Sequence, residues 1–189
     1  MELTVTYFEK PGQENTEACL RIVSEAVRTR GFKYIIVAST RGETGLRFSE
    51  QLKGAAAQVV VVTHSAGFKE PNTHEMEQDT RLQIEATGAK VYTGTMITHA
   101  LETAFASRFN GLYPALIVAQ ALRRFGEGTK VCCEITMMAV DAGLIPEHEE
   151  VLAVAGTAWG ADTVLLMRSA ASKRFLDLKV LEVLAKPRG

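Results

Sequence analysis

The sequence predicts an α/β protein built on a mostly parallel sheet. Runs that are apolar on consecutive residues, at 34–38, 59–63 and 151–155, are typical of parallel strands covered on both faces. Such runs alternate with helical patterns along much of the chain, which indicates right-handed strand–helix–strand crossovers. The segment 156–162 is too short for a helical crossover, so the strand from Thr163 should run antiparallel to the strand before it.

Size and composition favour a single domain over residues 1–189. A chain of 189 residues with 47% hydrophobic content can bury roughly 70% of its unfolded surface in one core. The net charge of -1 comes from acids and bases spread along the chain, which argues against a nucleic-acid surface. No segment approaches the roughly 20 apolar residues of a membrane span, and the N-terminus does not resemble a signal peptide. We therefore expect a cytoplasmic protein.

The first half of the chain has clear start and stop signals. Leu3, Val5 and Tyr7 alternate with polar residues as in a half-buried edge strand. Asn15 or Thr16 can cap a helix that Gly31 ends. The strand at 34–38, a helix over 43–53 and the strand at 59–63 follow. Asn72 and Glu75 have capping-box spacing, which predicts a helix that starts there and ends at Gly88.

The second half breaks the alternation with helices in succession. We expect a short strand at 90–93, helices over 97–109 and 114–126, and a helix over 130–142 that Gly143 ends. Residues 178–185 fit either a last strand beside the N-terminal one or a helix. Cys19, Cys132 and Cys133 are expected to be buried core residues, with a redox pair at 132–133 as the alternative.

The polar loop 39–45 joins the strand at 34–38 to the next helix, where parallel sheets bind ligands. Ser39, Thr40, Thr44 and backbone N–H groups near Gly42 and Gly45 can hold phosphate oxygens at the helix N-terminus. Arg41 would add a charge-assisted bond. The alternative is an ordinary capped loop with a solvated arginine, because the sequence is neither a Walker loop nor a GxGxxG fingerprint.

Four stretches resemble a known family, at 8–16, 62–71, 141–146 and 156–163. They are similar to the C-terminal α/β domain of pyruvate kinase, and more closely to free-standing archaeal and bacterial proteins of that type whose activity is not settled. The resemblance implies a three-layer α/β/α sandwich with strand order 3-2-1-4-5, strand 5 being antiparallel. It also implies FMN as cofactor, which would make the protein a flavoprotein. In pyruvate kinase the corresponding region holds an allosteric sugar phosphate.

With that strand order, the loops 39–45 and 156–162 face each other across a crevice. Gly156 and Gly160 permit close approach of backbone to a ligand, and Thr157 and Asp162 offer a hydroxyl and a carboxylate to a ribityl chain or ribose. Trp159 can stack on a ring. The alternative is a tight turn in which Asp162 bonds its own backbone.

Further candidates lie at the ends of neighbouring elements. Thr63 and His64 end the strand next to the crevice, and His64 can bond the ligand or act as acid or base, or be a structural hydrogen-bonding residue. Glu134 lies early in a largely apolar helix and can reach the crevice, or be a plain N-terminal charge. Thr93 to Thr95, Thr98 and His99 follow the far strand, so we interpret them as caps. His74, His99 and His148 lack metal-ligand spacing, and no metal site is expected.

The leading functional hypothesis is a protein that binds FMN or a related small phosphate-bearing ligand, with any catalysis undetermined. A non-catalytic regulatory module for a sugar phosphate is the second hypothesis, and a pure interaction or oligomerisation domain is the third. No nucleic-acid or membrane partner is expected, and self-association into a homo-oligomer is left open.

Overall fold

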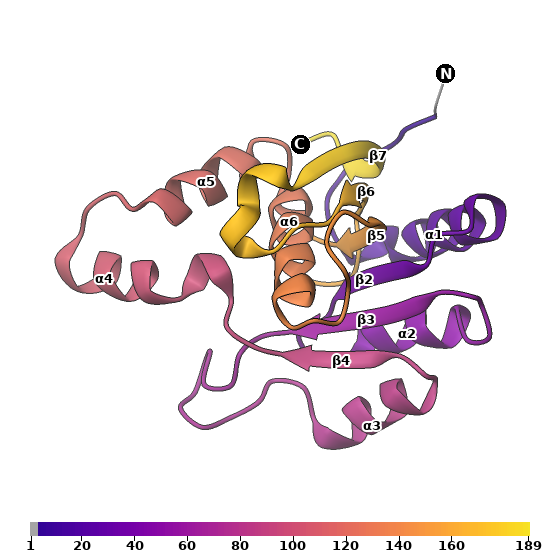
Figure 1. Ribbon diagram of the computed structural model, residues 1–189, viewed down its shortest axis with the longest axis horizontal. Coiled ribbons are helices and arrows are strands. Elements are labelled where there is room, and N and C mark those ends of the chain that lie inside the picture. The colour runs from indigo at the N-terminus through magenta and orange to yellow at the C-terminus, as the bar shows by residue number, and fades with distance from the viewer. Residues whose placement is uncertain (1–3) are drawn as a thin grey trace.

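The computed structural model describes residues 4–189, and its centre is a seven-stranded sheet of order β1-β7-β6-β5-β2-β3-β4 (Figure 1). β2, β3, β4 and β5 are mutually parallel, whereas β6 is antiparallel to both β5 and β7. The strands are β1 Thr6–Phe8, β2 Tyr34–Ala38, β3 Gln58–Thr63, β4 Lys90–Thr93, β5 Glu150–Ala155, β6 Thr163–Arg168 and β7 Lys179–Pro187.

The predicted order 3-2-1-4-5 corresponds to β4-β3-β2-β5-β6, which stand side by side in the sheet. The short turn after β5 does return the chain antiparallel. The sheet is larger than the order 3-2-1-4-5 that the resemblance implies, because β7 and β1 extend it beyond β6. β7 settles the open choice for residues 178–185 in favour of a strand, and it pairs with β1 in parallel. Leu3, part of the predicted edge strand, lies outside the described residues.

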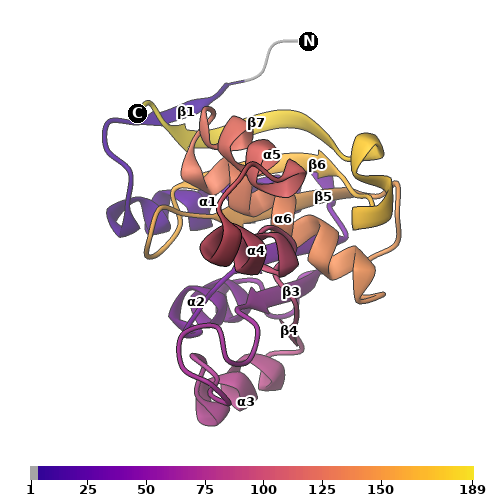
Figure 2. The same ribbon diagram turned by 90° about the vertical axis from the view of Figure 1, so that its left-hand side faces the viewer.

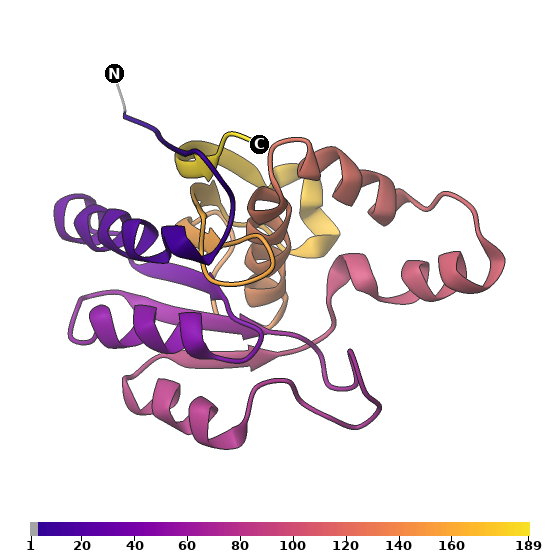
Figure 3. The same cartoon turned by 180° about the vertical axis from the view of Figure 1, so that it is seen from behind.

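Helices cover both faces of the sheet and make three layers. α1 Thr16–Arg30, α2 Glu43–Gln51 and α3 Gln78–Ala86 pack on the face that presents Ile35 and Val37 (Figure 3). α6 Glu127–Asp141 packs on the opposite face, against Ile36 and Val60 (Figure 2). Alternate residues of β2 thus enter different cores, which explains its continuous apolar run. Short 3-10 helices lie at Gln13–Asn15, Ile97–His99 and Ser172–Asp177.

α4 Leu101–Phe109 and α5 Pro114–Arg123 project to one side of the sheet (Figure 1). The predicted helix over 97–109 is in fact a 3-10 turn at Ile97–His99 followed by α4. α6 begins at Glu127, directly after Gly126 and earlier than predicted. It is buried along nearly its whole length, and its buried residues include Lys130 and Glu134.

The predicted capping box at Asn72 and Glu75 is wrong. Asn72 lies in a loop with φ of 63°, and α3 begins only at Gln78. The Glu75 side chain does not reach back to cap a helix, because it bonds instead to His64 and Lys69. A carboxylate that the sequence assigned to local structure therefore makes a tertiary contact at the carboxyl edge of the sheet.

All three cysteines are buried, as expected for core residues. Burial raises the pKa of the Cys19 thiol to about 12 and that of the Cys133 thiol to about 11, and it also raises the pKa of Cys132. Thiols held protonated in this way are poor nucleophiles. Separately, none of the helices in residues 4–189 is long and apolar enough to cross a membrane.

Candidate functional site

A cavity of about 290 Å³ opens at the carboxyl edge of the sheet, where the loops after β2 and β5 face each other. This is the point at which the chain direction reverses around the sheet. Ten of the predicted site residues line it: Ser39, Thr40, Arg41, Thr44, Thr63, His64, Glu134, Gly156, Trp159 and Gly160. The other four, Gly42, Gly45, Thr157 and Asp162, are absent from its walls.

The loop after β2 uses part of its polar groups to hold its own shape. The Gly45 N–H donates to Ser39 Oγ at 3.0 Å, so this N–H is not free for a ligand. Gly42 has φ of 108° and packs on Thr80, where a side chain would not fit. Thr63 Oγ1 donates to the Thr40 carbonyl at 2.7 Å and ties the loop to β3. Thr40, Arg41 and Thr44 are left facing the cavity.

Arg41 and Trp159 close the crevice from opposite loops. The Arg41 guanidinium carbon lies 4.6 Å from the centroid of the indole ring, a cation–π contact. Trp159 remains 47% exposed. Within residues 4–189, no carboxylate lies at ion-pair distance from Arg41. Its charge is therefore available to an anion.

The loop after β5 owes its conformation to Asp162, which is fully buried. The Asp162 carboxylate accepts the N–H groups of Gly12 and Thr157, each at 3.0 Å, and the Thr163 hydroxyl at 2.7 Å. Neither Asp162 nor Thr157 lines the cavity, and the Asp162 carboxylate is occupied by bonds within the protein. The structural alternative describes this loop better.

The glycines of this loop are required by close backbone packing. A side chain at Gly156 would meet the Gly160 carbonyl, and one at Gly160 would meet Gln13 and Thr16. The two glycines therefore allow other parts of the protein's own chain to pack closely against this loop. Both glycines also line the cavity, so the predicted close approach of backbone to a ligand stays a prediction.

His64 is held between two partners. Its Nδ1 lies 2.6 Å from Glu75 Oε2, and its Nε2 lies 3.3 Å from Thr40 Oγ1. Glu75 Oε1 in turn pairs with Lys69 Nζ at 2.9 Å. Burial alone would raise the pKa of the Glu75 carboxyl, but the bonds from Lys69 and His64 lower it below its ordinary value. Glu75 was not among the predicted site residues, because its spacing to Asn72 matches a capping box.

Glu134 forms a buried ion pair with Lys130 on the inner wall of the cavity, and Lys130 was not among the predicted site residues. Lys130 is 2% exposed and donates to Glu134 Oε2 at 2.5 Å. The Thr98 N–H and hydroxyl both donate to Glu134 Oε1 at 2.7 Å. Burial would raise the pKa of Glu134, but His99, Lys130 and Thr98 hold it well below its usual range. Glu134 is thus ionised at neutral pH and is unsuited to act as a general acid.

His99 also reaches the cavity, contrary to its interpretation as a distant cap. The 3-10 turn at Ile97–His99 folds back from β4 toward α6, which brings His99 Nδ1 to 4.0 Å from Glu134 Oε1. Thr98 does not cap a helix end; its N–H and hydroxyl donate to the buried Glu134 carboxylate instead. The signal available in the sequence was Lys130 and Glu134, spaced four residues apart in an apolar helix, where they need buried partners.

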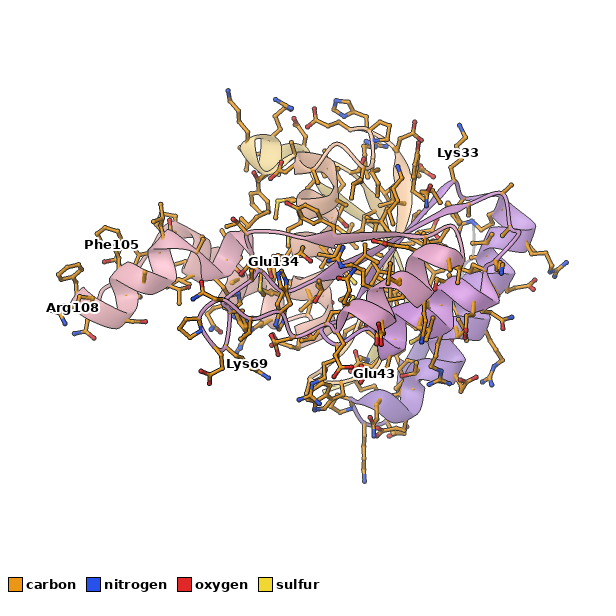
Figure 4. All side chains as sticks on the ribbon, turned by 90° about the horizontal axis from the view of Figure 1, so that it is seen from below. Lys33, Glu43, Lys69, Phe105, Arg108 and Glu134 are labelled. Atoms are coloured by element: carbon orange, nitrogen blue, oxygen red, sulfur yellow. The ribbon has the colours of Figure 1, made fainter. Side chains whose placement is uncertain are left out.

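The rest of the cavity is apolar on its inner side. Phe68 lies against both histidines, with ring centroids 4.4 Å from His64 and 5.9 Å from His99. Figure 4 shows Glu134 in the interior and Glu43 and Lys69 toward the periphery. The apolar lining consists of Ala38, Val62, Met96, Val131, Ile135 and Met138.

The cavity walls carry three Arg or Lys side chains and three carboxylates. These are Arg41, Arg123 and Lys130, and Glu43, Glu127 and Glu134. Arg123 pairs with Glu127 at 2.8 Å, and Lys130 pairs with Glu134. Arg41 and Glu43 are the members without an ion pair among the described residues. In residues 4–189, no group of three or more His, Cys, Asp or Glu side chains is arranged to hold a metal ion.

Fold and cavity together define an α/β domain with a polar crevice at the switch point of its sheet. The family model described as pyruvate kinase, alpha/beta domain, matches residues 17–167, and the chain belongs to that family. The crystal structure of O-ureido-L-serine synthase is similar at 16% identity with a TM-score of 0.32. That similarity covers 74% of this chain and 50% of the synthase chain, so this chain matches half the length of that protein.

Proposed function

We propose that the cavity binds a small phosphate-bearing ligand, with FMN as the specific candidate. The observation that carries the proposal is Arg41, an exposed cation beside the first turn of α2 that has no ion pair among residues 4–189. The phosphate would lie between the Arg41 guanidinium, the Thr40 and Thr44 hydroxyls and the N-terminus of α2. Helix N-termini favour anions because their first N–H groups lack partners in the helix.

The inner part of the cavity suits an apolar ring. Val131, Ile135 and Met138 of α6 and Met96 form an apolar surface there, next to the aromatic ring of Phe68. A ligand with a charged end and a planar apolar end would match both parts. Glu43 in the first turn of α2 opposes the phosphate, which limits the expected affinity.

A sugar phosphate in a non-catalytic regulatory site is the second candidate. It is favoured by the hydrogen-bonding side chains of His64 and His99, which face a cavity of only about 290 Å³. These groups can bond sugar hydroxyls as well as a ribityl chain. A cytoplasmic location and self-association stay predictions under either candidate.

Ligand specificity separates the two candidates. Flavin absorbance in the purified protein, together with stabilisation by FMN that exceeds stabilisation by riboflavin, supports the FMN proposal. A ligand at about 100 times its Kd stabilises the folded state by roughly 2.7 kcal/mol, which thermal denaturation detects readily. Stabilisation by sugar phosphates alone supports the second candidate. If neither class changes the melting temperature, both candidates are wrong.

A further inference from the structure

Three side chains form a hydrogen-bonded chain at the mouth of the cavity. Glu75 Oε2 is 2.6 Å from His64 Nδ1, and His64 Nε2 is 3.3 Å from Thr40 Oγ1. They come from two loops that leave neighbouring parallel strands, β2 and β3. A carboxylate, an imidazole and a hydroxyl thus stand in this order.

The imidazole is fixed on three sides. The Glu75 side chain is 10% exposed and is itself held by Lys69 at 2.9 Å. The Phe68 ring packs on the imidazole at a centroid distance of 4.4 Å. Glu75 orients the imidazole, Phe68 limits its rotation, and Nε2 is left facing Thr40.

These contacts also determine the tautomer. A carboxylate can only accept, so the proton of a neutral imidazole belongs on Nδ1. Nε2 then carries the lone pair and can accept the proton of the Thr40 hydroxyl. A hydroxyl within reach of a base that a third group orients is the arrangement that activates nucleophiles.

The position of Thr40 indicates which reaction this arrangement would serve. Thr40 lies in the loop between β2 and α2, directly before Arg41 and beside the site proposed above for the phosphate. We propose that Thr40 is a phosphoryl acceptor, that His64 is its general base, and that Glu75 is a positioning residue for His64. This inference rests on the proposed function and adds a reaction to it.

In this step Thr40 Oγ1 attacks the phosphorus atom and gives its proton to His64 Nε2. The bond from phosphorus to the leaving oxygen breaks, and the leaving group keeps that electron pair. Arg41 and the N-terminus of α2 offset the charge on the remaining phosphoryl oxygens. Since attack and departure are in line, His64 cannot protonate the leaving group. The substrate class is therefore a phosphate whose leaving group is a stable anion, such as an acyl phosphate, a phosphoanhydride or an aryl phosphate.

The test uses p-nitrophenyl phosphate with the full chain. We expect a burst of p-nitrophenolate in proportion to the protein, and a phosphorylated threonine at position 40 in the peptide mass spectrum. Thr40→Val should abolish both signals. Thr40→Ser retains a hydroxyl and should keep them, and a wild-type melting temperature of Thr40→Val excludes loss of folding as the cause.

The variants of the other two residues test their separate roles. General-base catalysis contributes on the order of 10² to 10⁴ in rate, so His64→Gln should slow the burst by roughly a hundredfold or more. Glu75→Gln should lower the burst rate at saturating substrate while the half-saturating concentration changes little. His74→Gln and Glu70→Gln are matched controls on exposed residues of the same loop and should leave the burst unchanged.

A wild-type protein without a burst and without phosphothreonine at position 40 would overturn the inference. So would a burst that His64→Gln leaves at the wild-type rate. FMN binding by the same preparations, followed by flavin fluorescence, separates this inference from the proposed function. Binding without phosphorylation refutes only the reaction, and phosphorylation without binding refutes only FMN as ligand. If both are absent, both proposals fail.

Discussion

Replacing Arg41 by alanine should weaken FMN binding by roughly ten- to a hundred-fold. Arg41 has no ion pair among residues 4–189, so its loss leaves no carboxylate without a partner in the free protein. Most of the effect on binding should then come from the missing bond to phosphate. A charge-assisted hydrogen bond contributes about 1.5 to 3 kcal/mol, and each 1.4 kcal/mol is about tenfold in Kd.

The variant also loses the contact with Trp159. An exposed cation–π pair is worth about 0.5 to 1 kcal/mol, so the melting temperature should fall only slightly. Titration of flavin fluorescence gives the two Kd values, and added salt should weaken wild-type binding more than binding by Arg41→Ala. Arg28→Ala, on the exposed side of α1, is the matched control. A change in Kd of less than twofold would remove Arg41 from the phosphate site.

Three further predictions concern stability. Gly156→Val should destabilise the fold and lower the urea midpoint, because its side chain would meet the Gly160 carbonyl; a wild-type midpoint would contradict the packing described for this loop. Lys130→Met should cost about 3 to 5 kcal/mol by leaving Glu134 buried without its partner, and the double variant with Glu134→Leu should recover much of that loss. The depressed pKa of Glu134 contributes stability above the ordinary value of 4.5 that is lost as the pH falls below it, so wild type should lose more stability on acidification than Glu134→Gln; equal losses would show that Glu134 is not the group responsible.

Much of the fold follows from local sequence signals. Gly31, with φ of 69°, ends α1 where predicted, and the apolar runs became β2, β3 and β5. The short segment after β5 predicted the antiparallel β6 from chain length alone. These features depend on the conformational preference of glycine, on the period of apolar residues and on the length of a connecting segment. All three can be read from the sequence.

The two loops of the crevice were predicted as well, but the sequence did not decide between a ligand-binding and a structural role for Ser39 and Asp162. Ser39 and Asp162 have the chemistry of ligand-binding groups, yet both satisfy backbone N–H groups of the protein itself. A serine or aspartate looks the same in the sequence whether it binds a ligand or bonds a backbone N–H of the protein. Which one it adopts depends on whether a buried donor lies nearby in the folded chain.

The sequence by itself determined the α/β class, the placement of most strands and the edge of the sheet at which a cavity would open. Only the tertiary structure brought Glu75 to His64, and His99 and Thr98 to Glu134. The physical reason is that each of these contacts joins side chains from different elements, whose distance depends on how the whole chain packs. Local rules assigned Glu75 to a helix cap and His99 to a remote turn, and tertiary packing placed both at the cavity.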